Sequence, residues 1–325
     1  MKIPRRAFLQ LATSAAALAS VPHVARGQGY PARPVRLVVG YAPGGPADVL
    51  ARLLGQWLSE RLGEQIIVEN RPGAGTNIAT EAVVHAPPDG YTLLFTSAAN
   101  FINATLYEKL PFNFMRDIAP VASLSREPNV MVVHPAVPAR TVAQFIAYAQ
   151  DNPGKITMAS GGIGASSHVS GELFKMLTSI DMVHVPYRGA GPALTALLGG
   201  QVQVYFSPMT TAIEHVREGK LRALAVTTVA RSPVLPDIPA VREYVPDYEA
   251  SQLYGIGAPR QTSSEIVLKL NADLNAFIAD PAIKARLADL GHTRLGGSPA
   301  DFEKLIAAET EKWGRVVKFS GARAD

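Results

Sequence analysis

The sequence predicts an α/β protein built from two doubly wound lobes. Apolar runs of strand length alternate with amphipathic stretches of helix length from Gln28 onward. This alternation is typical of parallel strand–helix units rather than of a β-sandwich. Two further strand-like segments, at 118–124 and 251–258, bracket a middle section that has its own strand–helix series. If both segments cross between the parts, the first and last parts of the chain form one lobe and the middle forms the other.

The individual elements follow from hydrophobic patterning and from helix-start signals. The first helix is expected over 49–62, where leucines and Trp57 recur on one face. Ser or Thr followed three residues later by Gln, Glu or Asp predicts helix starts at Thr141, Thr211, Thr262 and Ser298. The expected strands, in order, are 36–39, 65–69, 92–96, 130–133, 155–159, 182–185, 202–206 and 221–227.

This pattern predicts the division into lobes. Residues 28–123 and 253–325 are expected to form lobe I, and residues 124–252 lobe II. The hinge is expected near 120–124 and 252–256. A ligand cleft then lies between the lobes, and closure about the hinge would enclose a ligand.

Residues 1–27 have the features of a secretory signal peptide. A basic head that contains Arg5-Arg6 is followed by an apolar run over 11–21 and by small residues before a cleavage site. The arginine pair predicts a twin-arginine signal. The apolar run is far shorter than the roughly 20 residues of a membrane span. We therefore expect a soluble periplasmic protein once the signal peptide has been removed.

Charge and cysteine content exclude several classes of function. The formal net charge is +4, and the predicted leader carries four basic residues and no acidic one, so the rest of the chain is formally neutral. The high isoelectric point of the whole chain is therefore no evidence for binding to nucleic acid or to an anionic membrane, and we expect no nucleic-acid partner. The absence of cysteine excludes disulfides, Cys metal sites, a Cys nucleophile and a lipid-modified cysteine after the leader.

The turn 41–48, with the sequence YAPGGPAD, lies between the first expected strand and the first expected helix. Such a turn directs free backbone N–H groups, and the positive end of the helix dipole, towards the edge of the sheet. It predicts an anion site made of backbone, with candidate residues Tyr41, Ala42, Pro43, Gly44, Gly45 and Asp48. The alternative is an ordinary strand–helix turn without a ligand.

Three further loops, at 96–100, 160–168 and 186–192, end strands and open helices with small or polar residues. Ligands of open α/β sheets collect at such strand ends, where glycine permits close approach and hydroxyl groups can donate to a carboxylate. Taken singly, each loop also fits a purely structural role. The candidate ligand contacts are Thr96, Ser97, Ala98, Asn100, Ser160, Gly164, Ser166, Ser167, His168, Tyr187, Arg188, Gly189 and Ala190.

Motifs for catalysis and cofactor binding are missing from the sequence. There is no Gly-x-Ser-x-Gly, no His-Glu-x-x-His and no phosphate-binding loop, and the seven histidines occur singly. The turn 71–78 imitates a dinucleotide fingerprint only in part, because Ile78 stands in place of the third glycine. Asn77 in this turn is a candidate ligand contact, with helix capping as the simpler interpretation. We expect no cofactor, no metal and no enzymatic activity.

Five segments carry a likeness to a known family: APGGPAD at 42–48, VENRPGAG at 68–75, PDGYTLL at 88–94, VHVPYRG at 183–189 and LLGGQV at 197–202. In this order they resemble the Bug family, the extracytoplasmic substrate-binding components of tripartite tricarboxylate transporters. The likeness runs from Tyr30 to Trp313-Gly314, essentially the whole chain after the leader.

The resemblance implies a type II periplasmic-binding-protein fold with a ligand cleft between its lobes. It also implies a small carboxylate ligand, held by backbone amides, hydroxyls and water, and membrane permease subunits as partners of a monomer. Phe101 and Phe206-Ser207 depart from residues frequent in the family, so we add them as ligand candidates that suit a less polar ligand body. Arg188 could grip a second carboxylate or act as a surface or lobe–lobe cation.

Three functions are compatible with these features. The leading hypothesis is a carboxylate-binding protein that serves a transporter. A sensor that signals to a membrane histidine kinase would use the same fold. A secreted hydrolase or dehydrogenase is a more distant alternative, because no catalytic constellation is evident.

Overall fold

The computed structural model describes residues 29–324, so the signal peptide predicted at 1–27 lies outside the described residues. The strands are β1 (Val35–Val39), β2 (Ile66–Asn70), β3 (Thr92–Ser97), β4 (Ile118–Val133), β5 (Thr157–Ser160), β6 (Val183–Pro186), β7 (Val204–Pro208), β8 (Arg222–Val226), β9 (Ser251–Pro259) and β10 (Thr293–Arg294). The α-helices are α2 (Pro46–Leu62), α3 (Asn77–Val84), α4 (Ala98–Leu106), α5 (Phe114–Asp117), α6 (Val142–Asp151), α7 (Ser166–Thr178), α8 (Ala190–Leu198), α9 (Met209–Arg217), α10 (Ser264–Ala279), α11 (Pro281–Asp289) and α12 (Pro299–Ser320). Two short 3-10 turns are η2 (Ala74–Thr76) and η3 (Val241–Glu243).

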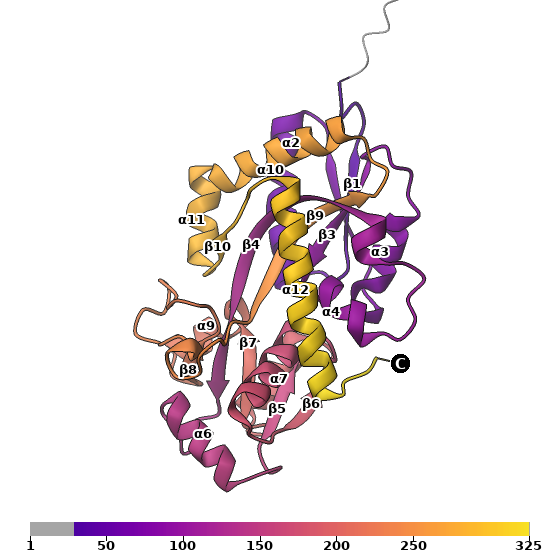
Figure 1. Ribbon diagram of the computed structural model, residues 1–325. Helices are drawn as coiled ribbons and strands as arrows, with labels where there is room; N and C mark the ends of the chain where they lie inside the picture. The colour runs from indigo at the N-terminus through magenta and orange to yellow at the C-terminus, as the bar shows by residue number, and fades with distance from the viewer. Residues whose placement is uncertain (1–28, 325) are drawn as a thin grey trace, which may run out of the picture. The chain divides into compact units, whose positions relative to one another are not determined.

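The predicted α/β fold with two lobes is confirmed. Each strand expected from the sequence overlaps an observed strand, and the two strand-like links are β4 and β9. The strands form one sheet in the order β2-β1-β3-β9-β4-β7-β5-β6, with β8 and β10 also paired to β4 (Figure 1). Pairing is parallel within β2-β1-β3 and within β7-β5-β6, as strand–helix alternation predicts. The centre of the sheet is antiparallel, because β4 and β9 run between the lobes in opposite directions.

β4 belongs to both lobes. Its first part, 118–128, pairs with β9, and its last part, 129–133, pairs with β7 and β8. The register between β4 and β9 shifts between Pro120 and Ala122 and again between Ser123 and Ser125. Such irregularities bend and twist a strand pair. They coincide with the predicted hinge near 120–124, although the hinge and the exact lobe boundaries stay predictions.

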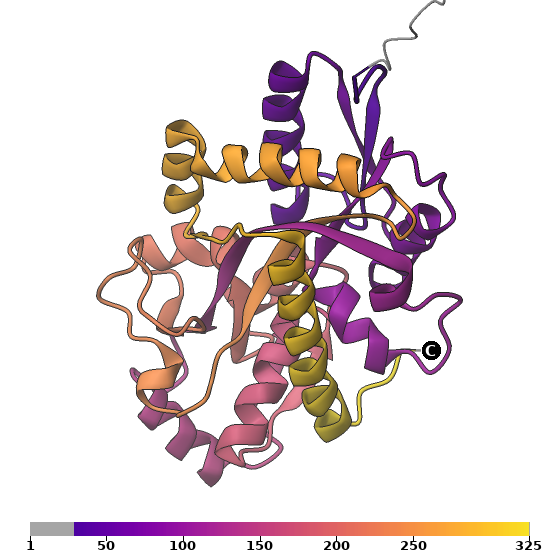
Figure 2. The ribbon, with the colours of Figure 1, turned by 45° about the horizontal axis from the view of Figure 1, so that its top comes forward.

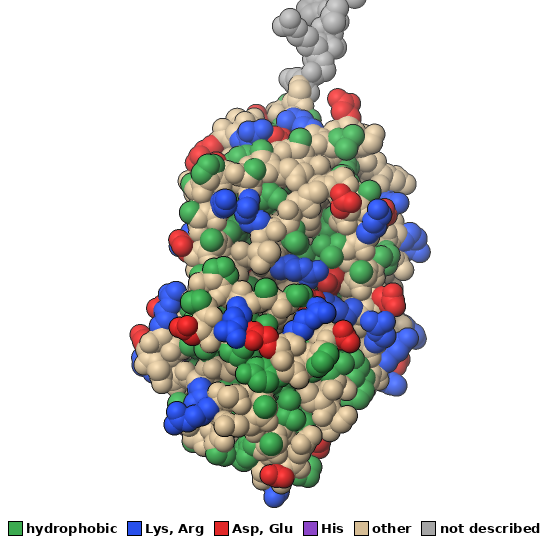
Figure 3. Space-filling model, turned by 60° about the vertical axis from the view of Figure 1, so that its left-hand side comes forward, with side chains coloured by type: hydrophobic (Ala, Val, Ile, Leu, Met, Phe, Trp, Pro, Cys, Tyr) green, Lys and Arg blue, Asp and Glu red, His purple; other side chains and the backbone are tan. Residues whose placement is uncertain are grey.

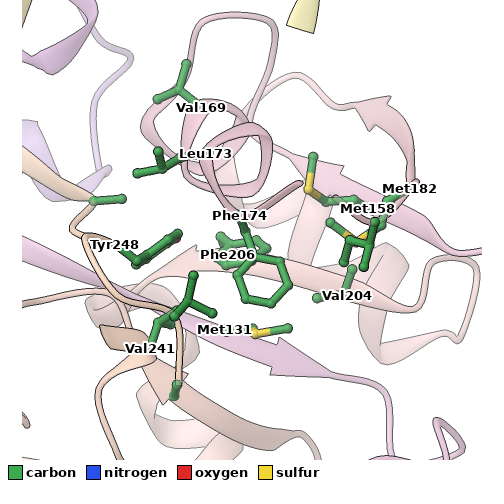
Figure 4. Packing of buried hydrophobic residues seen from close by; sticks show 14 of the residues in the cluster. Met131, Met158, Val169, Leu173, Phe174, Met182, Val204, Phe206, Val241 and Tyr248 are labelled. Atoms are coloured by element: carbon green, nitrogen blue, oxygen red, sulfur yellow. The ribbon is translucent and has the colours of Figure 1, made fainter. Parts of the chain in front are cut away.

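The long helix α12 lies along both lobes on the side of α4 and α7 (Figures 1 and 2). Its Trp313 is fully buried and belongs to an apolar cluster that includes residues of α4 and of α7. The same cluster continues into lobe II, where Phe174, Phe206 and Tyr248 pack together (Figure 4). Burial of these large side chains joins the two lobes along this side of the sheet.

Candidate functional site

Asp48 organises the turn between β1 and α2. Its carboxylate accepts hydrogen bonds from the Gly44 amide and the Arg52 guanidinium, both at 2.9 Å, and from the Asn70 side-chain amide at 2.8 Å. Burial alone would raise the pKa of Asp48, but these hydrogen bonds together lower that pKa below its usual range. Asp48 therefore fixes the shape of the turn. Because the Gly44 amide already donates to Asp48, it is not free to donate to a ligand, as the sequence predicts it would.

The helices α2, α7 and α8 begin with backbone N–H groups that have no acceptor inside the helix. This holds for every helix, because no helical carbonyl precedes the residues of the first turn. The first helical bond is donated by Val49 in α2, by His168 in α7 and by Ala193 in α8. The N–H groups that precede these donors carry the positive ends of the three helix dipoles. All three helix starts are therefore suited to an anion.

These helix starts surround one cavity of about 500 Å³. The turn after β1 and the loops after β5 and β6 all contribute to its lining. The cavity is large enough for a small organic ligand. Of the residues expected from the sequence, it is lined by Tyr41, Ala42, Pro43, Gly44, Gly45, Ser166, Ser167, Arg188, Gly189 and Ala190.

Two charged side chains, Arg188 and Glu127, line the cavity. Arg188 is exposed, whereas Glu127 is fully buried on β4. Glu127 lies directly opposite Gln252 of β9 in the antiparallel register, so the two side chains share a face of the sheet. Tyr254, two residues after Gln252, shares that face as well. These strand residues form the floor of the cavity.

The floor is held by hydrogen bonds among its own residues. The Glu127 carboxylate accepts one from the Tyr254 hydroxyl at 2.9 Å and one from the Thr210 hydroxyl at 2.6 Å. The Gln252 side-chain amide donates to the Tyr41 hydroxyl at 3.3 Å. Burial raises the pKa values of Tyr41 and Tyr254, and the negative charge of Glu127 raises both further. Both phenols therefore stay protonated.

Sequence reasoning did not find Glu127, Gln252 and Tyr254. They lie on two strands that are more than one hundred residues apart in the chain and meet only through sheet pairing. The available signal was a glutamate inside a mostly apolar stretch of strand length. A charge in such a stretch is costly unless something in the fold uses it.

The loop at the end of β3 lies behind the cavity rather than in its lining. Thr96, Ser97, Ala98 and Asn100 are all buried. The Asn100 side chain accepts from the Ser97 amide at 2.7 Å and donates to the Thr80 hydroxyl at 2.8 Å, which fixes the start of α4. The Ser97 hydroxyl lies 2.9 Å from the Tyr41 hydroxyl. This loop therefore supports Tyr41 from behind.

Asn77 is also away from the cavity lining. It is the first residue of α3, and the residue before it, Thr76, holds the N-cap position. The Asn77 side-chain oxygen accepts a hydrogen bond from the Asn103 amide at 2.8 Å. The expected capping role of Asn77 is therefore wrong by one residue, and its side chain ties α3 to α4.

Phe101, Phe206 and Ser207 are placed in the interior, contrary to the expectation that they lie in loops at the cleft. Phe101 is the fourth residue of α4, and its ring packs edge-on against Phe114 at 5.5 Å. Phe206 and Ser207 belong to β7 itself and are fully buried. The centroid of the Phe206 ring lies 5.6 Å from that of the Phe174 ring of α7 (Figure 4). Hydrophobic burial decides the position of both rings.

His168, Ser160, Gly164 and Tyr187 shape the two lobe II loops from behind. The His168 ring stacks on His184 with 3.8 Å between centroids, and it accepts a hydrogen bond from the Gly164 amide at 3.2 Å. The Ser160 hydroxyl lies 2.6 Å from His184 Nε2. Tyr187 packs against the apolar core of lobe II. None of these four belongs to the cavity lining.

A larger hollow of about 660 Å³ lies beside β10, but its arginines are already engaged. Arg126 pairs with Glu309 at 2.8 Å, Arg231 pairs with Glu243 at 2.7 Å, and Arg294 donates to a backbone carbonyl. This hollow therefore provides fewer unpaired positive groups for an anion than the cavity between the lobes does.

Three further observations concern metal ligands, membrane spans and surface charge. Within residues 29–324, no group of three or more His, Cys, Asp or Glu side chains could hold a metal ion, and no helix has the length and apolar character to cross a membrane. Acidic and basic side chains are mixed over the face in Figure 3, which is unlike the basic surface of a nucleic-acid-binding protein.

Comparison with known proteins identifies the family of this chain. The model of the tripartite tricarboxylate transporter family receptor, TctC, matches residues 50–322. The chain belongs to the TctC family. The resemblance to Bug proteins noted in the sequence is thereby confirmed, since BugT of Bordetella pertussis is 34% identical over 297 residues, which cover 90% of this chain and 91% of BugT.

Solved TctC-like structures share the fold over nearly the whole chain. MatC from Rhodopseudomonas palustris, solved with bound malate, is 34% identical with a TM-score of 0.80, and the match covers 89% of this chain and all of MatC. A second R. palustris protein, solved with adipate, is 35% identical with a TM-score of 0.84, and the match covers 90% of this chain and 99% of that protein. Both relatives hold small carboxylates.

Proposed function

We propose that this protein binds a small carboxylate in the cavity between the lobes and delivers it to the membrane subunits of a tripartite tricarboxylate transporter. The convergence of three helix N-termini on one cavity is the observation that supports carboxylate binding most directly. The exposed guanidinium of Arg188 adds a positive charge to the same lining. The family description and the carboxylates in two relatives agree with this role.

The proposed role requires the protein to lie outside the cytoplasmic membrane. We propose that residues 1–27 direct export, by the twin-arginine route, and that the exported protein works as a periplasmic monomer without catalysis. The basic and apolar pattern of the leader supports export. A relative with a TM-score of 0.81 is described as a periplasmic binding protein, which agrees with that location.

Side chains added at two cavity glycines are expected to block the ligand. A Cβ at Gly45 has no neighbour closer than 3.8 Å, and a Cβ at Gly191 has none within 4 Å, so Gly45→Val and Gly191→Val should fold normally. Each added side chain would occupy the place where a carboxylate meets a helix start. We expect each variant to weaken binding by at least about tenfold, since one lost hydrogen bond to a ligand costs about 1–3 kcal/mol.

Calorimetry with the acid found in a thermal-shift screen measures this effect. A ligand at 100 times its Kd should add about 2.7 kcal/mol to the stability of the unmodified protein. Gly199→Val serves as a matched control, because Gly199 lies outside the cavity lining and its Cβ would make only ordinary contacts. Unchanged affinity in both cavity variants, or no stabilisation by any small carboxylate, would contradict the proposed function.

Ligand binding is expected to draw the lobes together about the irregular β4–β9 pair. The two register shifts near Pro120 and Ser123 support this proposal, because irregular pairing bends a strand pair. Small-angle X-ray scattering should then give a smaller radius of gyration with a saturating carboxylate than without it. An identical radius in both conditions would identify a rigid binding module.

A further inference from the structure

The cavity lining combines two groups of residues with opposite electrostatic character. The three helix starts and Arg188 present hydrogen-bond donors and positive charge. The floor presents the carboxylate of Glu127 and the side chain of Gln252. A ligand that fills the cavity therefore meets both a donor-rich and an acceptor-rich part of the lining.

Glu127 is buried without a cation. Its exposed fraction is 0%, and within residues 29–324 its carboxylate accepts hydrogen bonds from Thr210 and Tyr254 but forms no ion pair. Strand alternation directs the neighbouring Arg126 to the opposite face of the sheet, where it pairs with Glu309 and Glu249. Burial of the nearby His292 lowers its pKa, so that imidazole is neutral near pH 7.

Gln252 provides a second, independent acceptor. Its side chain is 6% exposed and lines the cavity, and its Oε1 atom has no hydrogen-bond partner among the described residues. Its amide nitrogen is engaged with the Tyr41 hydroxyl. A buried acceptor without a partner is costly, so a donor from the ligand would satisfy it.

We propose that Glu127 and Gln252 determine ligand specificity: the preferred ligand is an organic acid that carries one carboxylate and, at its other end, an ammonium group. The carboxylate would meet the helix starts and Arg188. The ammonium group would donate to Gln252 and be attracted by Glu127 through the poorly screened interior. A second carboxylate in that place would be repelled. This inference rests on the proposed function of the cavity.

Three acids with the same number of methylene groups distinguish the effect of the charge of the second end group on affinity from the effect of its shape. Glutarate carries a second carboxylate, glutaramate carries an amide of nearly the same shape, and 4-aminobutanoate carries an ammonium group. We expect the unmodified protein to bind 4-aminobutanoate most tightly, glutaramate less tightly and glutarate most weakly. Each change of end group should alter the affinity by about tenfold, the effect of one charge interaction in a partly screened interior. The same three end groups on chains with one methylene fewer and one methylene more test shorter and longer ligands.

Glu127→Gln removes the charge while keeping the size of the side chain and an acceptor for Tyr254 and Thr210. In this variant 4-aminobutanoate should lose about tenfold in affinity and glutarate should gain, since the attraction and the repulsion disappear together. Glu303→Gln is the control, because Glu303 is a surface residue that is 55% exposed and absent from the cavity lining. Calorimetry at constant ionic strength measures all affinities.

The outcomes separate the two proposals. If acids bind and Gly45→Val weakens them all, but glutarate binds the unmodified protein as tightly as 4-aminobutanoate, then Glu127 does not select the ligand although the cavity does bind acids. An unchanged ranking in folded Glu127→Gln leads to the same conclusion. If no acid of any length binds the unmodified protein, both proposals are overturned. Because the first comparison needs no variant, a poorly folded Glu127→Gln leaves the test decisive.

Discussion

Gly255→Ala is expected to lower the free energy of unfolding by about 3 kcal/mol, which is large for the addition of one methyl group. Gly255 lies in β9, opposite Thr96 of β3 and Ser123 of β4. A Cβ at this position would overlap the Phe302 ring and would lie 2.8 Å from the backbone oxygen of Ala122. Because that oxygen belongs to the paired strand, relief of the overlap requires β4 and β9 to separate.

Urea unfolding followed by circular dichroism measures the loss. Gly199→Ala provides the comparison, since its Cβ would meet no atom closer than 3.4 Å, and its effect should stay below about 1 kcal/mol. Equal stability of Gly255→Ala and the unmodified protein would mean that the two central strands are packed more loosely than the structure shows.

The stacked pair of His168 and His184 is expected to make the protein lose stability below pH 6.5. Burial, together with the positive charges of His184 and Lys175, lowers the pKa of His168 to about 3. Burial and the charge of Lys175 lower the pKa of His184 to about 4. Since the unfolded chain takes up protons at these sites near pH 6.5 and the folded chain does not, acid favours unfolding. The stabilisation is complete above pH 6.5 and falls as the pH drops towards 4.

The magnitude follows from the size of the shift. Each pH unit below 6.5 costs about 1.4 kcal/mol for a histidine that stays neutral in the fold. Between pH 7.5 and 4.5, His168 alone should therefore remove about 3 kcal/mol. His184 adds less, because it is partly exposed and screened by solvent.

Unfolding measured at both pH values, in the unmodified protein and in His168→Gln and His184→Gln, tests this expectation. Each variant should show a smaller difference in stability between the two pH values, and His85→Gln, at an exposed position, should show the original difference. If the difference is the same in all four proteins, acid destabilisation arises elsewhere.

The elements of the fold were predictable because they depend on local patterns. Thr141 and Ser298 cap α6 and α12 as their spacing indicates. Thr211 does not cap a helix, because α9 already begins at Met209, directly after the proline that ends β7. Thr262 is one residue early, since Ser263 holds the cap of α10. Capping signals thus locate the start of a helix to within one turn. The exact first residue also depends on where the preceding strand ends.

The site was predictable only where it is made of backbone. The turns at 41–45, 166–167 and 188–190 could be recognised because glycine and small residues before a helix have a local meaning. Because Phe101 and Phe206 lie close to the ends of predicted strands in the sequence, both were expected to contact a ligand. Their direction, however, depends on helical phase and on which face of the sheet is buried. Glu127 entered the site only through a partner strand far away in the chain.

The position of β9 has a consequence for the order in which the protein takes shape during synthesis. β9 lies between β3 and β4 although it is made after all of lobe II. As the chain leaves the ribosome, β3 therefore has one edge open until residue 259 has emerged, and α12 is completed only with Ser320. The strands of lobe II pair with one another within residues 129–226, so all of these partners have emerged before β9 is made. The lobe made second is thus able to fold first, while the nascent lobe I exposes a strand edge that must be kept from pairing with other chains.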